Sequence, residues 1–226
     1  MNILVVAAHP DDEVLGCGGS MARLNEEGHD VYVCILGEGV TSRYAKRATA
    51  SKRALKMLHE QGLQVVRMLG ARDLMLYHLP DNQFDTVPLL DVIKIIEKVI
   101  EQVRPEVIYT HCGSDLNIDH SVVHRAVITA TRPVSGHGVT DIYAFEVPSS
   151  TEWSFQQFGP MFGPNVFVDI SRTLDKKLKA MELYQGETRP FPHPRSSEAL
   201  RNLASRWGIV AGIKAAEAFE LVRSIR

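Results

Sequence analysis

The sequence predicts an α/β protein with a Rossmann-like, mostly parallel sheet flanked by helices, in a single domain that spans residues 1–226. Short apolar runs that are typical of buried strands alternate with longer stretches in which apolar residues recur at helical spacing. Loops rich in His, Asp, Gly and Pro follow several of the strand-like runs. This alternation favours parallel strands joined by helical crossovers, because parallel neighbours need a long connection.

The first part of the chain establishes the alternation. Residues 2–8 form an apolar run with β-branched side chains and predict a buried strand. Residues 19–27 predict a helix that ends at a glycine. Residues 30–36 are a second apolar run and predict the second strand. Apolar side chains in residues 46–61 recur near helical spacing and predict a helix, whereas the short apolar run 65–69 predicts a third strand.

The second part continues the same pattern. Residues 87–103 carry a stripe of leucines and isoleucines and predict a helix. Residues 106–110 predict a further strand, and residues 120–131 predict the helix that follows it. Later strands are expected at residues 141–147 and 165–170. The C-terminal part beyond them is expected to be mainly helical.

Composition and charge exclude several classes of function. Of the 226 residues, 45% are hydrophobic and 23% are charged, as in an ordinary soluble globular protein. A formal charge of −2 gives no field that would attract nucleic acid or an anionic membrane, so neither is an expected partner. The three cysteines have no paired spacing and indicate buried thiols in a reducing compartment. No run is long enough to span a bilayer or to serve as a signal peptide, so the expected location is cytoplasmic.

An imidazole and three carboxylates follow directly on the first predicted strand, in the segment His9-Pro10-Asp11-Asp12-Glu13. Proline stops the strand there, so these side chains are expected at the strand's C-terminal end. That edge is where open α/β sheets bind their ligands. Clustered carboxylates repel one another unless a cation, a proton or a strong donor compensates them. The segment therefore predicts a metal ion with a base beside it.

A second segment with metal-binding chemistry begins at His111 and ends at His120, after the fourth predicted strand. It is therefore expected at the same edge of the sheet as the first segment. Together, His9, Asp12 and His120 offer two nitrogens and one oxygen, a set that zinc accepts while it keeps an open position. An open zinc site polarises a carbonyl and lowers the pKa of water, and a free carboxylate such as Asp11 can take up the proton.

These segments resemble a known family. The first segment, with residues 15–19 (LGCGG) after it, resembles the signature of the PIG-L/LmbE-like deacetylases. Asp119 and His120 resemble the second metal motif of that family, and residues 193–196 and 216–219 resemble one of its branches. The resemblance implies zinc-dependent removal of the acetyl group from a small-molecule substrate, an N-acetylated amino sugar or glycoconjugate. It also suggests a homo-oligomer.

The resemblance assigns roles to the first residues of the site. It implies that His9, Asp12 and His120 bind one zinc ion per chain and that Asp11 is the general base. A simpler interpretation is that Asp11 caps the following helix. The two roles do not exclude each other.

The resemblance also indicates residues that would bind substrate. Arg47 resembles the substrate-pocket arginine of the family, and Asp81 resembles a pocket acid. The glutamate that the family has after that arginine is replaced by Ala50, which leaves the orientation of Arg47 open.

The second segment departs from the family at Asn117, where many members have a histidine that is the proposed acid or oxyanion partner. Asparagine can donate a hydrogen bond to an oxyanion, but it cannot deliver a proton to a leaving amine. Three sources of that proton stay open: His111, His193, or Asp11 returning the proton that it collected.

Two other functions compete with a deacetylase. Clustered aspartates also suit Mg²⁺ or Mn²⁺ in a phosphoesterase, although the histidines in the set favour zinc. The glycines Gly16 and Gly18 suggest a dinucleotide-binding protein. In that fold the glycines follow the strand immediately, and here the metal-type segment intervenes.

Overall fold

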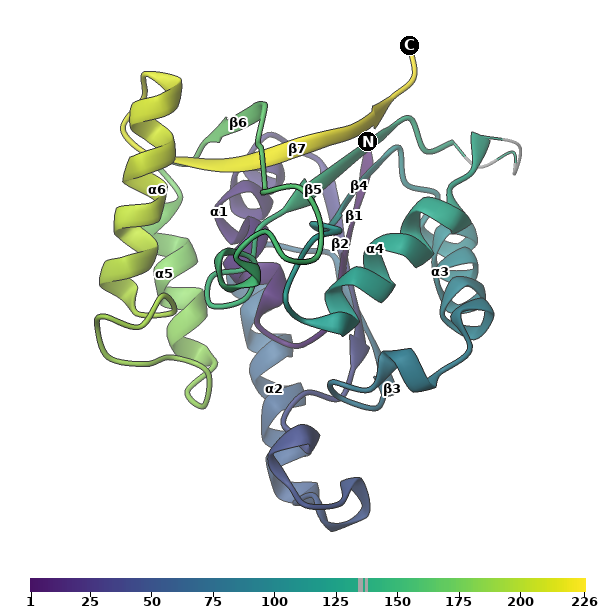
Figure 1. Ribbon diagram of the computed structural model, residues 1–226. Helices are drawn as coiled ribbons and strands as arrows, with labels where there is room; N and C mark the ends of the chain where they lie inside the picture. The colour runs from purple at the N-terminus through teal and green to yellow at the C-terminus, as the bar shows by residue number, and fades with distance from the viewer. Residues whose placement is uncertain (134–135, 137) are drawn as a thin grey trace.

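The described residues form one sheet of seven strands in the order β3-β2-β1-β4-β5-β7-β6 (Figure 1). The computed structural model describes residues 1–133, 136 and 138–226. The strands are β1 (Asn2–Ala7), β2 (Asp30–Gly37), β3 (Asp73–Leu79), β4 (Val107–His111), β5 (Asp141–Phe145), β6 (Val166–Asp169) and β7 (Ala216–Ser224). The first five run parallel, and β7 is antiparallel to both β5 and β6. The predicted α/β class with a mostly parallel sheet is confirmed.

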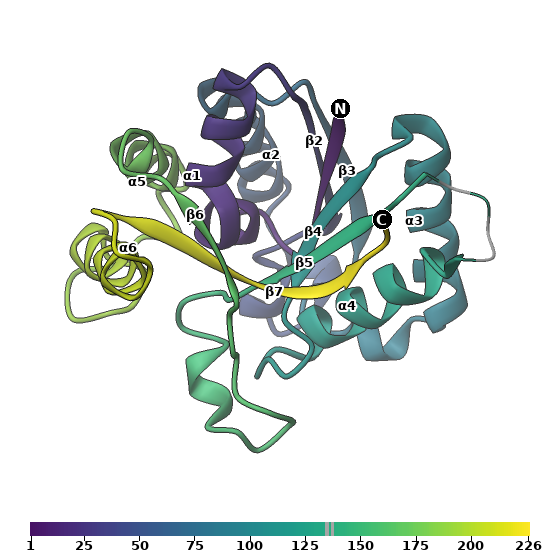
Figure 2. The same cartoon turned by 90° about the horizontal axis from the view of Figure 1, so that it is seen from above.

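Helices cover both faces of this sheet, as Figure 2 shows. They are α1 (Asp12–Glu26), α2 (Lys52–Leu69), α3 (Leu89–Val103), α4 (Ile118–Ala130), α5 (Leu174–Leu183) and α6 (Ser197–Ala211). Side chains from α1, α2, α5 and α6 join one hydrophobic core, and those from α3 and α4 join a second core on the other face. Alternate residues of the central strand β1 enter the two cores, as a strand buried on both faces requires.

The order of the strands reverses at β1, which has β2 on one side and β4 on the other. Leu4 in the middle of β1 is in register with Tyr32 on β2 and with Ile108 on β4. Open α/β sheets bind ligands beside the carboxyl ends of strands at such a reversal. The two polar segments of the sequence begin where β1 and β4 end, so the topology brings them together.

The third strand is not where the sequence analysis expected it. The prediction of a strand at residues 65–69 is wrong, because these residues form the end of helix α2. Val65, Val66 and Leu69 continue a buried stripe that starts at Leu58 and Gly62, which is helical spacing. The third strand is β3, whose side chains are mostly half-buried because it lies at the edge of the sheet.

The C-terminal part is helical only as far as α6. The final residues form β7, an element that the sequence analysis did not predict. The alternation of buried and exposed side chains that is typical of a strand is missing at its start. Its first four residues are all buried, where β7 pairs with β5 and β6. No helix in the described ranges has both the length and the apolar character that crossing a bilayer requires.

Helix α1 begins at Asp12, earlier than predicted, and contains a break at Cys17, where φ is −146° and ψ is 22°. The carboxylate of Glu217 on β7 accepts the backbone N–H groups of Gly19 at 2.9 Å and Ser20 at 2.6 Å, so it caps the second half of the helix. Lys177 on α5 donates to the same carboxylate at 2.6 Å. This buried pair ties three elements together behind the first polar segment.

Candidate metal centre and catalytic site

The three residues expected to hold a metal ion lie together at the ends of β1 and β4. Nδ1 of His9 is 3.2 Å from Oδ2 of Asp12, and Nε2 of His120 is 3.2 Å from the same oxygen. One ligand atom from each residue lies within 4.8 Å of the others, and all three side chains are buried. Donors about 2.1 Å from a tetrahedral zinc ion are roughly 3.4 Å apart, so the spacing fits such an ion.

His120 shows why a cation fits this position. Both of its ring nitrogens are buried, and neither has a partner with hydrogen-bond geometry in the described part of the chain, although Asp12 and Asp115 lie close. An unpaired polar atom in the interior costs free energy. A metal ion bound by Nε2 would satisfy this atom.

A carboxylate lies behind each imidazole of the site. Nε2 of His9 lies 2.9 Å from Asp119, and Nδ1 of His120 lies 3.1 Å from Asp115. Imidazoles that bind metals usually present one nitrogen to the ion and the other to a carboxylate or a carbonyl. His9, Asp81 and Asp119 form a second group close enough to hold an ion. Both oxygens of Asp119 already accept backbone N–H groups, at 2.7 and 2.9 Å, so the first group is the better candidate.

Negative charge dominates the site. Burial lowers the pKa of His120, but the carboxylates of Asp12 and Asp115 outweigh burial and raise the pKa to about 9. Burial also lowers the pKa of His9, yet hydrogen bonds to Asp119 and Asp12 hold it well above its ordinary value. Burial raises the pKa of Asp12, but His120 and His9 bring it well below its usual range. A divalent cation would replace the protons that these imidazoles otherwise bind.

Asp11 lies beside this group and does not cap α1 through its side chain. Its Oδ2 instead accepts a hydrogen bond from Nη1 of Arg195 at 2.5 Å. Burial raises the pKa of Asp11, and the positive charge of Arg195 partly opposes that shift. The carboxylate is therefore free of the helix and lies in the wall of the cavity beside the proposed ligands.

A cavity of 110 Å³ opens between His9, Asp11 and the loops around them. Its walls come mainly from loops that follow β1, β2, β3, β4 and α5, with Leu58 of α2, and most of its side chains are polar. Besides His9 and Asp11, the polar side chains that line it are Ser42, Arg43, Asp81, Asn82, Asn117, Glu187 and Arg195.

Two of the three residues expected to bind substrate line this cavity. One oxygen of Asp81 accepts hydrogen bonds from the backbone N–H and the hydroxyl of Ser42, at 3.0 and 2.7 Å. The other oxygen lies 3.3 Å from Nε2 of His9. Oδ1 of Asn117 accepts the backbone N–H of Asp119 at 2.9 Å and so caps α4. The amide nitrogen of Asn117 remains as a hydrogen-bond donor.

His111 lies behind the cavity and does not line it. Its fully buried ring stacks on His120 with the centroids 4.0 Å apart, and its Nε2 accepts the backbone N–H of Ala8 at 2.8 Å. Burial and the neighbouring His120 hold the pKa of His111 well below its ordinary value. A neutral imidazole that accepts a backbone hydrogen bond supports His120 but is poorly placed to give a proton to a substrate.

His193 and Arg47 also lie outside the cavity. Nδ1 of His193 accepts the backbone N–H of Arg195 at 3.1 Å, and its ring packs edge-on against Trp153. It therefore braces the loop that carries Arg195. Arg47 donates twice to Glu38, at 2.9 and 2.8 Å, and once to a carbonyl of β3 at 2.7 Å. These contacts hold Arg47 on the surface.

Three charged residues of the cavity were not predicted from the sequence. Nη2 of Arg43 donates to both carboxylate oxygens of Glu187, at 2.7 and 2.6 Å, and Nη1 of Arg195 lies 3.6 Å from the same carboxylate. Glu187 and Arg195 belong to the loop between α5 and α6, far along the chain from the first polar segment. Residues 193–196 resemble one branch of the family, but that resemblance assigns no role to Arg195.

The glycines of α1 pack against neighbouring elements. A Cβ on Gly16 would lie 2.2 Å from the ring of Phe145 on β5, and a Cβ on Gly18 would lie 3.1 Å from the side chain of Val14. In a dinucleotide-binding turn, glycines let the backbone approach a pyrophosphate. The close packing accounts for these glycines, so they give no support to the dinucleotide alternative.

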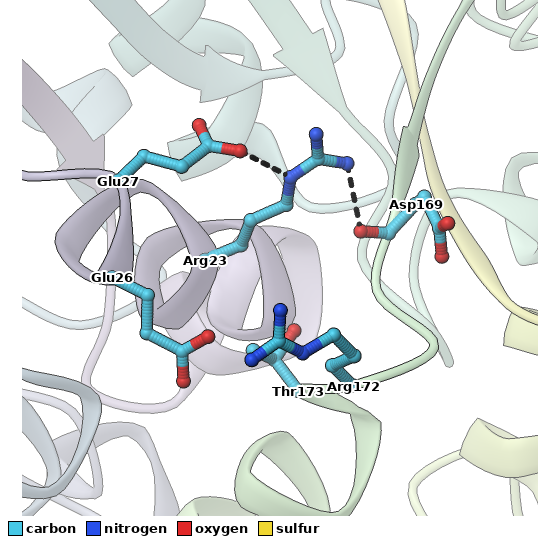
Figure 3. Close-up of a pocket in the computed structure, with 6 residues that line it drawn as sticks. All are labelled: Arg23, Glu26, Glu27, Asp169, Arg172 and Thr173. Carbon is cyan, nitrogen blue, oxygen red and sulfur yellow. Dashed lines mark hydrogen bonds and ion pairs between the residues drawn. The ribbon is translucent and has the colours of Figure 1, made fainter.

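A second polar pocket, of 320 Å³, lies beside the C-terminal end of α1 (Figure 3). Its lining residues are Arg23, Glu26, Glu27, Asp169, Arg172 and Thr173. Arg23 donates to Glu27 at 2.7 Å and to the backbone carbonyl of Asp169 at 3.0 Å, as the dashed lines in Figure 3 mark. No histidine or cysteine is among these lining residues, so the pocket lacks the imidazole ligands of the first site.

Comparison with known proteins identifies the family. The family model described as GlcNAc-PI de-N-acetylase (PIG-L) matches residues 4–131, more than half of the chain and the part that holds both polar segments. The chain belongs to the PIG-L family. This confirms the family predicted from the two motifs.

Several relatives in this family are named deacetylases. The diacetylchitobiose deacetylase of Thermococcus kodakarensis is 24% identical, and the match covers 99% of this chain and 84% of that protein. A probable N-acetyl-α-D-glucosaminyl L-malate deacetylase 2 of Bacillus cereus is 26% identical over 83% of this chain and 84% of that protein. The crystal structure of the N,N′-diacetylchitobiose deacetylase from Pyrococcus horikoshii has the same fold, with a TM-score of 0.78, 18% identity, and coverage of 98% of this chain and 84% of that one.

One relative carries a different name. The 4-oxalmesaconate hydratase of Pseudomonas putida is 28% identical over 81% of this chain and 73% of that protein. The relatives of this chain therefore include proteins named for two different reactions.

Proposed function

We propose that this chain is a zinc-dependent N-deacetylase that hydrolyses the acetamide group of an N-acetylated amino sugar or glycoconjugate. The observation that carries the proposal is the convergence of His9, Asp12 and His120, all buried, beside the carboxylate of Asp11. Two imidazoles and one carboxylate are a ligand set typical of catalytic zinc, which keeps an open coordination position. The relatives named deacetylases support the class of reaction.

Bound zinc would polarise the acetyl carbonyl and make water more acidic. Asp11 takes the proton from the attacking water and returns it to the amine nitrogen as the C–N bond breaks. His111 is neutral behind the cavity and His193 lies outside it, so Asp11 is the best-placed group for both transfers. Arg195 and Asn117 line the cavity as donors that can stabilise the negative charge on the carbonyl oxygen.

The remaining wall of the cavity suits a hydroxylated substrate. Asp81 and Glu187 present carboxylates, and Ser42 and Asn82 add a hydroxyl and an amide. Such groups pair with the hydroxyls of a sugar, and few apolar side chains line the space. We therefore assign Asp81 and Asn117 to substrate binding, and we leave Arg47 out of the substrate site.

The test is an amine-release assay on N-acetylglucosamine and N,N′-diacetylchitobiose, with zinc measured on the same preparations by elemental analysis. Wild-type protein should contain about one zinc ion per chain and release amine. Asp11→Asn should keep its zinc and lose about 10²- to 10⁴-fold in turnover, because a general base typically contributes that much. His120→Ala should lose the metal as well as the activity. A fully active Asp11→Asn variant would refute the role of the base.

A hydratase is the second candidate, because one relative of similar identity carries that name. A site that activates water beside a carboxylate can also add water across a polarised double bond. Adding 4-oxalmesaconate to the same assay, and following its loss of absorbance, separates the two reactions. A chromogenic phosphate ester in a further well tests the phosphoesterase alternative.

Two expectations concern the molecule as a whole. We expect a homo-oligomer, and light scattering on purified protein measures its mass. We also expect a cytoplasmic location, and fractionation of cells that express the tagged protein checks it.

A further inference from the structure

Asp11 has a backbone conformation that residues with a side chain rarely adopt. Its φ is 112° and its ψ is −29°. The other non-glycine residues with positive φ in the described ranges have values between 47° and 72°, within or near the ordinary left-handed region. A conformation of this kind persists only where the surroundings determine it, and it is often found at functional sites.

Two buried side chains hold this conformation. Oε2 of Glu13 accepts the backbone N–H of Asp11 at 3.0 Å, and Oε1 of Glu13 accepts the hydroxyl of Tyr184 at 2.6 Å. Tyr184, at the C-terminal end of α5, and Glu13 are both fully buried. The carbonyl of Asp11 accepts the backbone N–H groups of Val14 and Leu15, at 3.0 and 2.9 Å. The peptide groups on both sides of the Asp11 side chain are thus fixed.

This arrangement frees the carboxylate of Asp11. An aspartate at the start of a helix ordinarily has extended backbone angles, and its side chain accepts a backbone N–H of the first turn. That geometry would point the carboxylate into the helix. With Glu13 bound to its backbone N–H, Asp11 makes no side-chain cap, and its carboxylate meets Arg195 at the cavity.

We propose that Glu13 and Tyr184 are positioning residues that hold Asp11 in its left-handed conformation and so aim the catalytic carboxylate at the cavity. This inference rests on the proposed function, in which Asp11 transfers protons. Neither residue lines the cavity, so each acts through Asp11 and not on the substrate. A shift of about 1 Å in a catalytic group can cost about 10²-fold in rate, so the loss of this support should be measurable.

The experiment compares variants of the full-length, zinc-loaded enzyme. Tyr184→Phe removes only the hydroxyl and should lower kcat about tenfold, with KM and zinc content unchanged. Glu13→Ala should lower kcat further, and Glu13→Gln, which keeps an oxygen to accept the Asp11 N–H, should retain a larger share. Tyr109→Phe is the matched control, because Tyr109 is also a buried tyrosine but packs on Tyr143 and Phe219, away from Asp11. This control should keep the wild-type kcat.

A second measurement separates positioning from general damage. Adding Tyr184→Phe to Asp11→Asn should cause no further loss, because the carboxylate that Tyr184 supports is already absent. An equal tenfold loss in that background would overturn the inference, as would an unchanged kcat in Tyr184→Phe alone.

A crystal structure of Glu13→Ala tests the same idea without an activity assay. The φ of Asp11 should leave the left-handed region, and a φ that stays near 112° would overturn the inference. A wild-type enzyme that releases no amine from any N-acetyl sugar would instead count against the proposed function, whatever the crystal structure shows.

Discussion

Glu146 offers a test of how burial acts on a single carboxyl group away from the metal centre. It follows β5, and its Oε1 accepts a hydrogen bond from the indole N–H of Trp207 at 2.5 Å. Burial raises the pKa of Glu146 from 4.5 to about 7, and the hydrogen bond from Trp207 only partly offsets that rise. Glu146→Gln keeps the shape and the accepting oxygen but removes the charge, so it isolates the cost of burying the carboxylate.

The direction of the effect on stability follows from the raised pKa. Between pH 4.5 and 7 the folded protein keeps a proton on Glu146 that the unfolded chain loses. The free energy of unfolding is therefore not reduced by Glu146 below pH 4.5, and it falls as the pH rises toward 7. A rise from 4.5 to about 7 corresponds to about 3 kcal/mol, because one pKa unit is worth about 1.4 kcal/mol. Glu146→Gln should therefore be more stable than the wild type by about 3 kcal/mol at pH 8 and by about 1 kcal/mol at pH 5.

Urea unfolding of both proteins at pH 5 and pH 8, followed by tryptophan fluorescence and circular dichroism, measures these differences. Glu101→Gln, an exposed position on α3, is the control and should change the free energy of unfolding by no more than about 0.5 kcal/mol at either pH. A stability gain in Glu146→Gln that is the same at pH 5 and pH 8 would refute the reasoning, because it could not come from the ionisation of Glu146.

Two further predictions concern buried charge and bound metal. Lys177→Met should lower the free energy of unfolding by about 3–5 kcal/mol, because it leaves the buried carboxylate of Glu217 without its positively charged partner. Lys177→Met combined with Glu217→Leu should lose less than the two single losses added together. Removal of zinc with a chelator should lower the Tm of the wild type, because a ligand that binds only the folded state stabilises it, and added zinc should restore the Tm. The Tm of His120→Ala should not respond to either treatment, and a response equal to that of the wild type would place the ion elsewhere.

Much of the proposed metal centre could be predicted because its residues follow strands that are easy to recognise. The apolar runs before His9 and before His111 are short, continuous and bounded by turns, so their C-terminal ends could be located. The parallel topology then requires these ends to meet at one edge. The convergence of His9, Asp12 and His120 follows from those two facts alone.

The rest of the site depends on contacts that have no local pattern. Glu187 and Arg195 reach the cavity from a loop whose path is set by the packing of α5 and α6, and no periodicity in the sequence reports that path. Arg43 lies in the site and Arg47 outside it, although only four positions separate them, because Glu38 pairs with Arg47 while Glu187 pairs with Arg43. Sequence reasoning cannot choose between two such arginines without the fold.

The errors in the secondary structure have a similar cause. Apolar residues such as Val65 and Leu69 fit a buried strand as well as the buried face of a helix. The helical spacing becomes visible only when Leu58 and Gly62 are included, and these lie outside the short apolar run. The strand β7 has no alternating pattern at its start, because its first four residues are all buried. In both segments, packing against the rest of the protein determines the conformation, and the local sequence alone does not.

The cap that Glu217 provides for α1 forms late in the synthesis of the protein. Glu217 lies 198 residues beyond Gly19 and 197 beyond Ser20, yet it caps the helix that begins with the first polar segment. During synthesis, every proposed zinc ligand leaves the ribosome about a hundred residues before this cap exists. A nascent chain therefore carries its metal-binding groups long before the scaffold behind them is finished, and a chain that ends prematurely before β7 would keep the ligands but lack their support.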